Sequence, residues 1–381
     1  MYKKAKSLLT LLFCLFRLSI STAAESEFNF RWILPPEYYQ GKDFYDGRAW
    51  VQEKKDGPWT LFDTEGNVIK KDFNANNIMQ GHNEDTRFES IEKDSETGWN
   101  MYGVIDHSGN IISEPKPYKY PPFIQEGMVL KQGENGLWGY VDFQENWVVL
   151  PAYEGFILWG DGLMPAKKDG KWGYINKEGE VVIDFCFEQA YSFRNGLAAA
   201  SQNSLYGLID LDGNWVTEAV YERFYYPMSN LIADQIAAQK EGKIGYLDAK
   251  GNVVIDFKFT GIDGMRGGTS SSGIAAFHEG RATVPLSKKG QGRDEIYTLG
   301  VINEFGDIVS TKQDTFMTAY SNGFAVAVRD KELFMLDRDG KEHSLPSVFQ
   351  QEGVNITRSD DGIFRVHFKK EDKTGYFKVK N

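Results

Sequence analysis

The sequence contains little cysteine and no excess of basic charge. Only 2 of its 381 residues are Cys, which excludes a disulfide-stapled scaffold. It has 43 Lys and Arg against 54 Asp and Glu, a net charge of −11, and so lacks the positive field needed to bind nucleic-acid phosphates. Its 26 Phe, 19 Tyr and 9 Trp exclude a disordered chain. A folded, acidic protein remains, and we expect no nucleic-acid partner.

A long hydrophobic run is also lacking. The apolar stretch Leu8–Phe16 is too short to cross about 30 Å of hydrocarbon. It follows a basic start and precedes the small residues Ser21–Ala24, which is the order of a secretory signal peptide. We predict that residues 1–24 are this signal, that no stable membrane span remains after cleavage, and that the protein is exported to the periplasm or to the extracellular side of the cell envelope. Cleavage removes four basic residues and no acidic one, which changes the net charge from −11 to −15.

The two cysteines have no disulfide to form with each other after cleavage. Cys14 lies within the signal, and whether it is lipidated stays open, although Leu11-Leu12-Phe13 lacks the small residue that precedes lipidated cysteines. Cys186 lies between Phe185 and Phe187, and we expect it to be a small, buried hydrophobic residue.

A short string recurs along the rest of the chain. It consists of an aromatic residue and Gly, two or three apolar residues, Asp or Asn, two variable residues, Gly, and a β-branched run. Trp172-Gly173-Tyr174-Ile175-Asn176, followed by Gly179, is a clear copy. Eight copies follow one another with a basic period near 34 residues and some insertions, and Gly375-Tyr376-Phe377 begins a ninth.

Each copy is typical of a β-hairpin. Asp at the first turn position and Gly at the fourth, as in Asp63-Thr64-Glu65-Gly66, predict a type I turn, because Asp hydrogen-bonds within its turn and Gly adopts positive φ without strain. The strand before the turn is apolar at successive positions, such as Tyr140 and Val141, which indicates a sheet covered on both faces. The Gly after the aromatic residue leaves room for a close neighbour.

A further strand of small residues precedes each hairpin, as in Gly196-Leu197-Ala198-Ala199-Ala200. Small side chains suit the crowded inner wall of a ring or superhelix. The repeat is therefore three strands with no helix, and the fold class is all-β. An aromatic ring stands three residues before the glycine of these strands, at Phe44, Phe193, Phe277 and Tyr320.

In these strings the chain resembles the WG-repeat family (WG containing repeat), bacterial proteins built from tandem units of this kind. The resemblance covers roughly Gly41 to Asn381. It implies an exported or envelope-associated all-β repeat protein without a demonstrated activity, and it supplies no catalytic residues. We predict one domain, residues 25–381, of about eight full repeats and a terminal half repeat, folded as a β-propeller-like ring or as an open β superhelix.

The two ends of the repeat region complement each other. Residues Gly375–Val379 form the first arm of a hairpin that lacks its second, and Trp32-Ile33-Leu34-Pro35 resembles the second arm Val148-Val149-Leu150-Pro151. We hypothesise that the N-terminal strand completes the last unit and closes a ring, which removes two exposed sheet edges. The open superhelix stays the alternative, because nine units exceed the usual ~4 to 8 propeller blades.

The sequence contains no recognisable catalytic or metal-binding motif. The acidic turns Asp210–Gly213 and Asp337–Gly340 lack the further oxygen ligands of a calcium loop, so we interpret them as turns. No Gly-x-Ser-x-Gly elbow or phosphate-binding loop occurs, and Met265–Ser272 is expected to be a surface loop. We expect no cofactor and no metal, since the histidines are isolated in sequence, at His82, His107, His278, His343 and His367.

Aromatic residues outside the repeat positions are the better functional candidates, because rings exposed on loops of a rigid scaffold stack on sugars or anchor a peptide. We predict a non-enzymatic binding or assembly module for a protein or glycan partner. The alternatives are a structural envelope component, and a hydrolase of envelope polymers with its site in the insertion loops 261–273 and 287–295. The partner-binding candidates are Tyr118, Tyr120, Trp159, Tyr225 and Tyr226.

Overall fold

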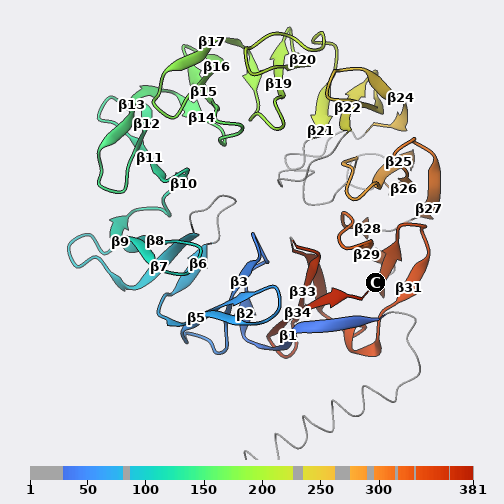
Figure 1. Ribbon diagram of the computed structural model, residues 1–381, viewed down its shortest axis with the longest axis horizontal. Coiled ribbons are helices and arrows are strands. Elements are labelled where there is room, and N and C mark those ends of the chain that lie inside the picture. The colour runs from blue at the N-terminus through green and yellow to red at the C-terminus, as the bar shows by residue number, and fades with distance from the viewer. Residues whose placement is uncertain are drawn as a thin grey trace, which may run out of the picture.

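The computed structural model describes residues 29–79, 86–225, 235–261, 275–289, 296–313, 316–329, 332–359 and 361–380. In these residues the strands form nine small antiparallel sheets, and there is no α-helix. The sheets follow one another around a central axis as the blades of a propeller (Figure 1). The all-β prediction is confirmed, and of the two architectures that it left open the structure has the ring. The predicted signal, residues 1–24, and the segment Met265–Ser272 lie outside the described residues.

We number the blades along the chain and give their strands from the axis to the rim. Blade 1 consists of β2 (Gln40–Gly41), β3 (Arg48–Gln52), β4 (Trp59–Asp63) and β5 (Val68–Phe73). Blade 2 consists of β6 (Asn77–Met79), β7 (Thr86–Lys93), β8 (Asn100–Ile105) and β9 (Ile111–Tyr118). Blade 3 consists of β10 (Ile124–Gln125), β11 (Met128–Gln132), β12 (Trp138–Val141) and β13 (Trp147–Tyr153). Blade 4 consists of β14 (Gly155–Phe156), β15 (Met164–Lys168), β16 (Lys171–Ile175) and β17 (Val181–Phe187). Blade 5 consists of β18 (Gln189–Ala190), β19 (Ala198–Gln202) and β20 (Leu205–Ile209). Blade 6 consists of β21 (Arg223–Tyr225), β22 (Ile236–Lys240), β23 (Lys243–Leu247) and β24 (Val253–Thr260). Blade 7 consists of β25 (Ala282–Lys289), β26 (Ile296–Ile302) and β27 (Ile308–Gln313). Blade 8 consists of β28 (Phe316–Met317), β29 (Phe324–Arg329), β30 (Glu332–Asp337) and β31 (Glu342–Ser344), and a short 3-10 turn, η3 (Ser347–Phe349), follows it. Blade 9 consists of β32 (Val354–Arg358), β33 (Ile363–Phe368), β34 (Lys373–Val379) and β1 (Phe30–Tyr38).

The ninth blade is assembled from both ends of the chain. β1 pairs antiparallel with β34, with Phe30 opposite Val379 and Trp32 opposite Phe377. Figure 1 shows β1, in blue, beside the red strands β33 and β34. The hypothesis that the N-terminal strand completes the last unit is therefore confirmed. In a closed ring every blade has a neighbour on each side, whereas an open superhelix has an uncovered unit at both ends.

The prediction of three strands per repeat was incomplete. Seven of the nine sheets in the described residues have four strands, and those of blades 5 and 7 have three. The additional strand is the innermost one, which in most blades has two or three residues and is too short to show an alternating pattern. The strand of small residues consequently lies second from the axis, for example β19, where Ala198 and Ala200 are buried.

The Asp turns form as predicted. In blade 1 the amide of Gly66 donates to the carbonyl of Asp63 at 3.0 Å, and Gly66 has a φ of +84°. The Asp63 carboxylate accepts hydrogen bonds from the amides of Glu65 and Asn67. Asp210 accepts from Asp212 and Asn214 in the same way, so this pair of acids serves a turn.

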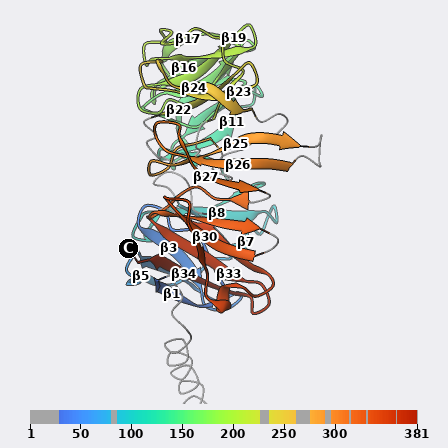
Figure 2. The same ribbon diagram turned by 90° about the vertical axis from the view of Figure 1, so that its right-hand side faces the viewer.

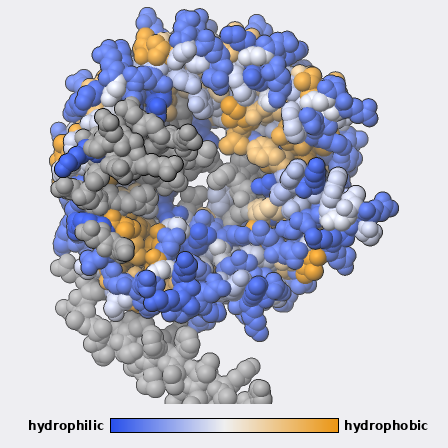
Figure 3. Space-filling model, turned by 180° about the vertical axis from the view of Figure 1, so that it is seen from behind, coloured by the Kyte–Doolittle hydropathy of each residue, from blue (hydrophilic) through white to orange (hydrophobic). Residues whose placement is uncertain are grey.

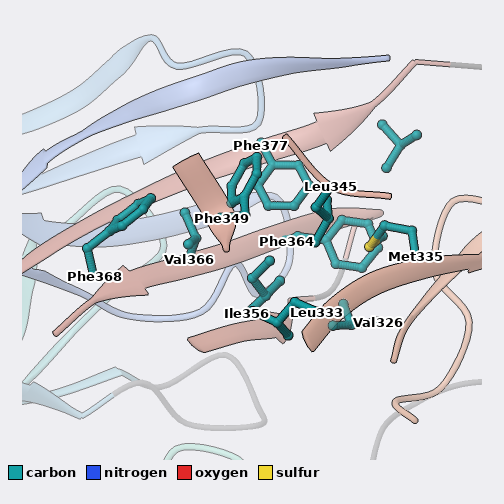
Figure 4. Packing of buried hydrophobic residues seen from close by; sticks show 11 residues of the cluster. Val326, Leu333, Met335, Leu345, Phe349, Ile356, Phe364, Val366, Phe368 and Phe377 are labelled. Atoms are coloured by element: carbon teal, nitrogen blue, oxygen red, sulfur yellow. The ribbon is translucent and has the colours of Figure 1, made fainter. Parts of the chain in front are cut away.

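The hydrophobic core lies between the blades rather than at one centre. Each described core cluster draws its residues from two adjacent blades. Figure 4 shows the cluster between blades 8 and 9, in which Phe349 of η3 packs on Phe377 of β34, with ring centroids 5.2 Å apart. The pairs predicted to be covered on both faces are buried, as with Tyr140 and Val141. A blade thus gains its stability from its neighbours, as expected for a repeat protein.

The glycine of the aromatic-Gly pair makes room for the fourth strand. A Cβ on Gly173 would lie 2.6 Å from the carbonyl oxygen of Ile183 and 2.9 Å from the backbone nitrogen of Phe185. The register between β16 and β17 shifts at this point, so the bulged backbone of β17 occupies the space that a side chain would need. In blade 8, where Phe334 replaces the glycine, β30 and β31 pair without a shift. Blade 1 keeps the shift with Thr60 at this position.

The prediction that Cys186 is buried was wrong. Its side chain is exposed and its thiol is free. Ile183 and Phe187 are the buried residues of β17, and the bulge between them places Cys186 on the outer side of the strand. An apolar run on a bulged strand does not alternate regularly, so the two phenylalanines did not predict the environment of the residue between them.

A carboxylate links blades 7 and 8. Glu342 of β31 accepts hydrogen bonds from both terminal nitrogens of Arg329, at 3.0 and 2.8 Å, and from Lys312 of β27 at 2.7 Å. The hydrogen bonds from Arg329 and Lys312 lower the pKa of Glu342 to about 2. Since this folded-state pKa lies below the ordinary value of 4.5, the stabilisation is present above pH 4.5 and is lost as the pH falls towards 2.

We expect Glu342→Gln to lower the free energy of unfolding by about 1 to 2 kcal/mol at pH 7, a value that allows for solvent screening of this partly exposed group. The difference from the wild type should shrink towards zero near pH 2. Urea unfolding at a series of pH values measures it. The control is Glu352→Gln, because the Glu352–Lys370 pair is highly exposed and should contribute nothing measurable. A pH-independent effect of the Glu342 substitution would contradict this account.

Candidate functional site

Trp159 and Tyr225 are buried, which corrects the expectation that they are exposed rings. The side chain of Trp159 is 6% exposed and packs with Tyr140 between blades 3 and 4. It stands three residues before Gly162, the same spacing that relates Phe193 to Gly196. Its position was missed because the strand after Gly162 begins with Leu-Met-Pro instead of small residues.

The rings at this position are wedges between neighbouring blades. Phe193 packs on Tyr174 of the preceding blade with centroids 4.7 Å apart, and Phe44 packs on Tyr376 across the closure at 5.2 Å. Tyr225 is also buried, and its hydroxyl donates to Oε1 of Gln239 at 2.5 Å. These rings hold blades together and are not available to a partner. Tyr226 lies outside the described residues.

Tyr118 and Tyr120 lie on the surface of blade 2, at its end toward blade 3. Tyr120 is 71% exposed, in the connection between β9 and β10, and the Lys119 ammonium lies 5.6 Å from the centre of its ring. Tyr118, the last residue of β9, is half-buried against Tyr102, and burial raises the pKa of its hydroxyl. The exposed-ring prediction is therefore met fully by Tyr120 and partly by Tyr118.

The structure adds three residues to this surface. Trp99 and Phe123 are exposed large rings, and Ile91 is an exposed aliphatic residue. Trp99 ends the turn between β7 and β8, and its neighbour Asn100 is paired with Tyr118, so Trp99 lies at the same end of the blade as Tyr118. Sequence analysis missed these residues because they stand next to the repeat strings without belonging to them.

We call these five residues, Ile91, Trp99, Tyr118, Tyr120 and Phe123, the aromatic surface. They lie in, or at the strand ends next to, connections between second and third strands or between successive blades, which an antiparallel ring places on one face. The long β25–β26 hairpin extends from that face, to the right in Figure 2. Seen from this face, the ring has a central opening and is mostly hydrophilic, with apolar residues beside the opening and spaced along the rim (Figure 3).

Prolines and hydrogen bonds on both sides of Tyr120 restrain the loop that carries it. It begins after Pro117 and contains Pro121 and Pro122, whose rings fix the backbone φ. Arg87 of β7 donates a hydrogen bond to the carbonyl of Pro122, and Lys116 donates to the carbonyl of Phe143 in blade 3 at 2.6 Å. A ring on such a loop loses little conformational freedom when it meets a partner.

The chemistry that this surface offers is stacking and apolar contact rather than proton transfer. Exposed Trp and Tyr provide large apolar area at low entropic cost. Two acidic residues, Glu92 and Glu96, are exposed in the β7–β8 turn region next to Trp99. The charges of Lys93 and Lys119 are exposed as well, so the surface carries both signs.

Histidines in the described part of the chain lie beside single carboxylates or are buried. No group of three or more His, Cys, Asp or Glu residues there is arranged to hold a metal ion. His343 pairs with Asp337 at 2.7 Å, and His107 lies 3.5 Å from Asp46. Burial, together with Arg358, lowers the pKa of His278 to about 4, so this histidine is neutral at pH 7.

A second exposed feature lies on the outermost segment of blades 1 to 7, directly after the Asp or Asn turn, with two exposed residues in most blades and one in blades 5 and 7. Its residues are exposed by between 38 and 52%. Most of these residues belong to the β-branched run of the Gly-x-Val-Val string, which predicted a strand. The run does not indicate which of its residues are exposed. We call this set the apolar rim: Val68, Ile69, Ile111, Ile112, Trp147, Val148, Val181, Val182, Trp215, Val253, Val254 and Ile308.

Among the described residues, no helix has the length and apolar character that a membrane crossing requires.

Comparison with known proteins identifies the repeat. The family model described as WG containing repeat matches residues 29–55, 102–129, 138–172, 172–206, 206–233 and 244–270. No curated protein matches the sequence.

The chain is similar to several solved structures at low sequence identity. The crystal structure of a eukaryotic initiation factor has a TM-score of 0.51 at 8% identity, over 81% of this chain and 87% of that one. The WD40 domain of SCAP from fission yeast has a TM-score of 0.38 at 8% identity, over 93% and 98% of the two chains. Hsv2p of Kluyveromyces lactis has a TM-score of 0.32 at 10% identity, over 90% and 97%. At these identities the likeness concerns the fold alone.

Proposed function

Since the chain belongs to the WG containing repeat family and closes into a ring of nine blades, we propose that it is a non-enzymatic binding or assembly module. Its partner is a protein or a glycan, and its place of action is the periplasm or the extracellular side of the cell envelope. The basic, apolar and small-residue order of residues 1–24 supports export.

The observation that carries the proposal is the aromatic surface. A closed ring held by inter-blade wedges is a rigid scaffold, and binding residues on such scaffolds are found on the connecting loops. Tyr120 is a large ring that is mostly exposed on a connection braced by two hydrogen bonds. A ring in this setting contributes no core packing, whereas an exposed Tyr or Trp at the centre of an interface contributes strongly to binding.

A photo-reactive amino acid at position 120, in cells that express the protein with its own N-terminus, tests the proposal. We expect one reproducible adduct, with either a protein or a glycan, because Tyr120 lies at the contact. The same amino acid at position 205 is the control, since Leu205 is exposed in blade 5 outside the aromatic surface. Equal labelling patterns at the two positions would count against the aromatic surface.

Substitution of Tyr120 tests how much this side chain contributes to binding. We expect Tyr120→Ala to weaken capture of the cross-linked partner at least tenfold and to leave the melting temperature within about 1 °C, because the side chain is outside the core. Leu205→Ala should leave both quantities unchanged. Titration of the partner against purified protein, with thermal unfolding of each variant, measures them. Loss of capture together with a large fall in melting temperature would indicate a structural role for Tyr120 instead.

A further inference from the structure

We propose that the apolar rim of blades 1 to 7 and the acidic turns beside it form a second docking surface, for a basic and apolar segment of a partner protein. This surface is separate from the aromatic surface. It lies on the outermost segment of each blade, which is the fourth strand in blades 1 to 4 and 6, β27 in blade 7 and the segment after the turn in blade 5. In the described residues these strands have a neighbouring strand on one side only. Large exposed apolar residues that recur in one position mark an interaction site rather than scattered surface residues.

The rim is continuous because the blades interlock there. Where the turn contains a glycine, that glycine packs against the preceding blade. A Cβ on Gly179 would lie 3.3 Å from Cγ1 of Val149, directly after the exposed pair Trp147 and Val148. Gly213 stands in the same relation to Ile183, at 2.8 Å. Exposed apolar pairs and Asp turns therefore alternate around the rim.

The turns next to these pairs are strongly acidic. The seven five-residue turns of blades 1 to 7, listed at the end of this paragraph, contain twelve acidic residues and two lysines. Two of the acids are paired with residues outside the turns, Glu65 with Arg31 and Glu145 with Lys131. Taken together the turns still carry more acidic than basic residues, which gives a negative potential along this surface, although Asp248 and Lys250 balance each other in blade 6. The turns are residues 63–67, 106–110, 142–146, 176–180, 210–214, 248–252 and 303–307.

The apolar pairs and the excess of negative charge end at the same blade. In blade 8 the turn Asp337–Lys341 carries two acidic and two basic residues, and Glu342 and His343 stand where the other blades have their exposed pair. In blade 9 the fourth strand is β1, where Arg31 is the exposed residue between Phe30 and Trp32. Blade 8 therefore lacks both the exposed pair and the excess of acidic residues, whereas blade 6 keeps its exposed pair beside a neutral turn.

The charge decides which occupant fits. A second copy would bring its own acidic turns against these, and an anionic membrane or nucleic acid would be repelled in the same way. A segment with alternating basic and apolar residues satisfies both components, because its apolar side chains cover the exposed pairs while its cations lie near the turns.

The test uses the mature protein and a fluorescent peptide of six Lys-Val repeats. The rim variant carries Val181→Ser, Val182→Ser, Val253→Ser and Val254→Ser, and the control carries Leu205→Ser, an exposed apolar residue outside both surfaces. We expect saturable binding by the wild type and the control, and at least tenfold weaker binding by the rim variant. A Glu-Val peptide and a Lys-Ser peptide should each bind at least tenfold more weakly than the Lys-Val peptide.

Thermal unfolding of the rim variant verifies that it is folded, which is expected because the four valines are about half exposed. The proposal is overturned if the rim and control variants bind the Lys-Val peptide equally, or if the Glu-Val or Lys-Ser peptide binds as well. It is also overturned if sedimentation shows a dimer that the rim substitutions dissociate, since a second copy then covers this surface. Rim-dependent binding to vesicles of anionic lipid overturns it as well.

Discussion

Deletion of residues 25–38 is expected to lower the melting temperature by more than about 10 °C, because it removes β1 from the ninth blade. Ile33 and Leu34 are buried at the closure, and Phe30 and Trp32 pack on Phe349 and Phe377. Loss of the burial of Phe30, Trp32, Ile33 and Leu34 costs roughly 6 to 12 kcal/mol, at about 1.5 to 3 kcal/mol each. Differential scanning calorimetry of the mature and truncated proteins measures the change.

A complementation experiment separates ring closure from a general effect of truncation. A synthetic peptide of residues 29–39 should restore most of the lost stability when it is added to the truncated protein, because it can pair with β34 as β1 does. The control peptide carries Trp32→Ser and Leu34→Ser, and should not restore it. An unchanged melting temperature after the deletion would falsify the view that β1 holds the ring closed.

Gly173→Ala is expected to destabilise the protein by about 3 kcal/mol, which is large for the addition of one methyl group. The methyl group would meet the backbone of Ile183, Asp184 and Phe185 at 2.6 to 2.9 Å, and backbone of a paired strand cannot rotate away as a side chain can. The bulge of β17 would have to shift, and with it the strand edge that the next blade packs against. Chemical denaturation of purified protein measures the loss.

The control for this prediction is Gly155→Ala, in the same blade. A Cβ on Gly155 meets nothing within 4 Å, and its φ is not in the left-handed region. We expect its stability to stay within about 0.5 kcal/mol of the wild type. Similar effects of the two substitutions would mean that the loss arises from backbone entropy common to both, and that the close approach at Gly173 is not its cause.

The elements that the sequence predicted well are those set by neighbouring residues. The Asp turns depend on the Asp carboxylate and on a Gly with positive φ three residues later, and they formed at the predicted places. The burial of both Tyr140 and Val141 followed from two successive apolar positions. The closure by Trp32-Ile33-Leu34 was also readable, because a hairpin arm without a partner stood at each end of the chain.

The candidate site was less predictable, because exposure is a property of the assembled ring. Trp159 and Tyr120 are both aromatic residues between strands, yet one is wedged between two blades and the other is exposed. The inter-blade position of Trp159 is indicated in the sequence only by its place three residues before Gly162. No sequence feature of this kind indicates that Trp99 and Phe123 are exposed. Contact with an adjacent blade involves residues some 20 to 35 positions away, which local patterning does not specify.

By itself the sequence determined the repeating unit: its hairpin, its turn, its apolar faces and the number of its copies, because these depend on residues that are close along the chain. The tertiary structure decided which parts of that unit are exposed. Cys186 points outward, the valine pairs form the apolar rim, and the innermost strand appears only when the blades are assembled. The physical reason is that each blade is covered by its two neighbours, so what remains exposed depends on how tightly they approach, down to the space left by a single glycine.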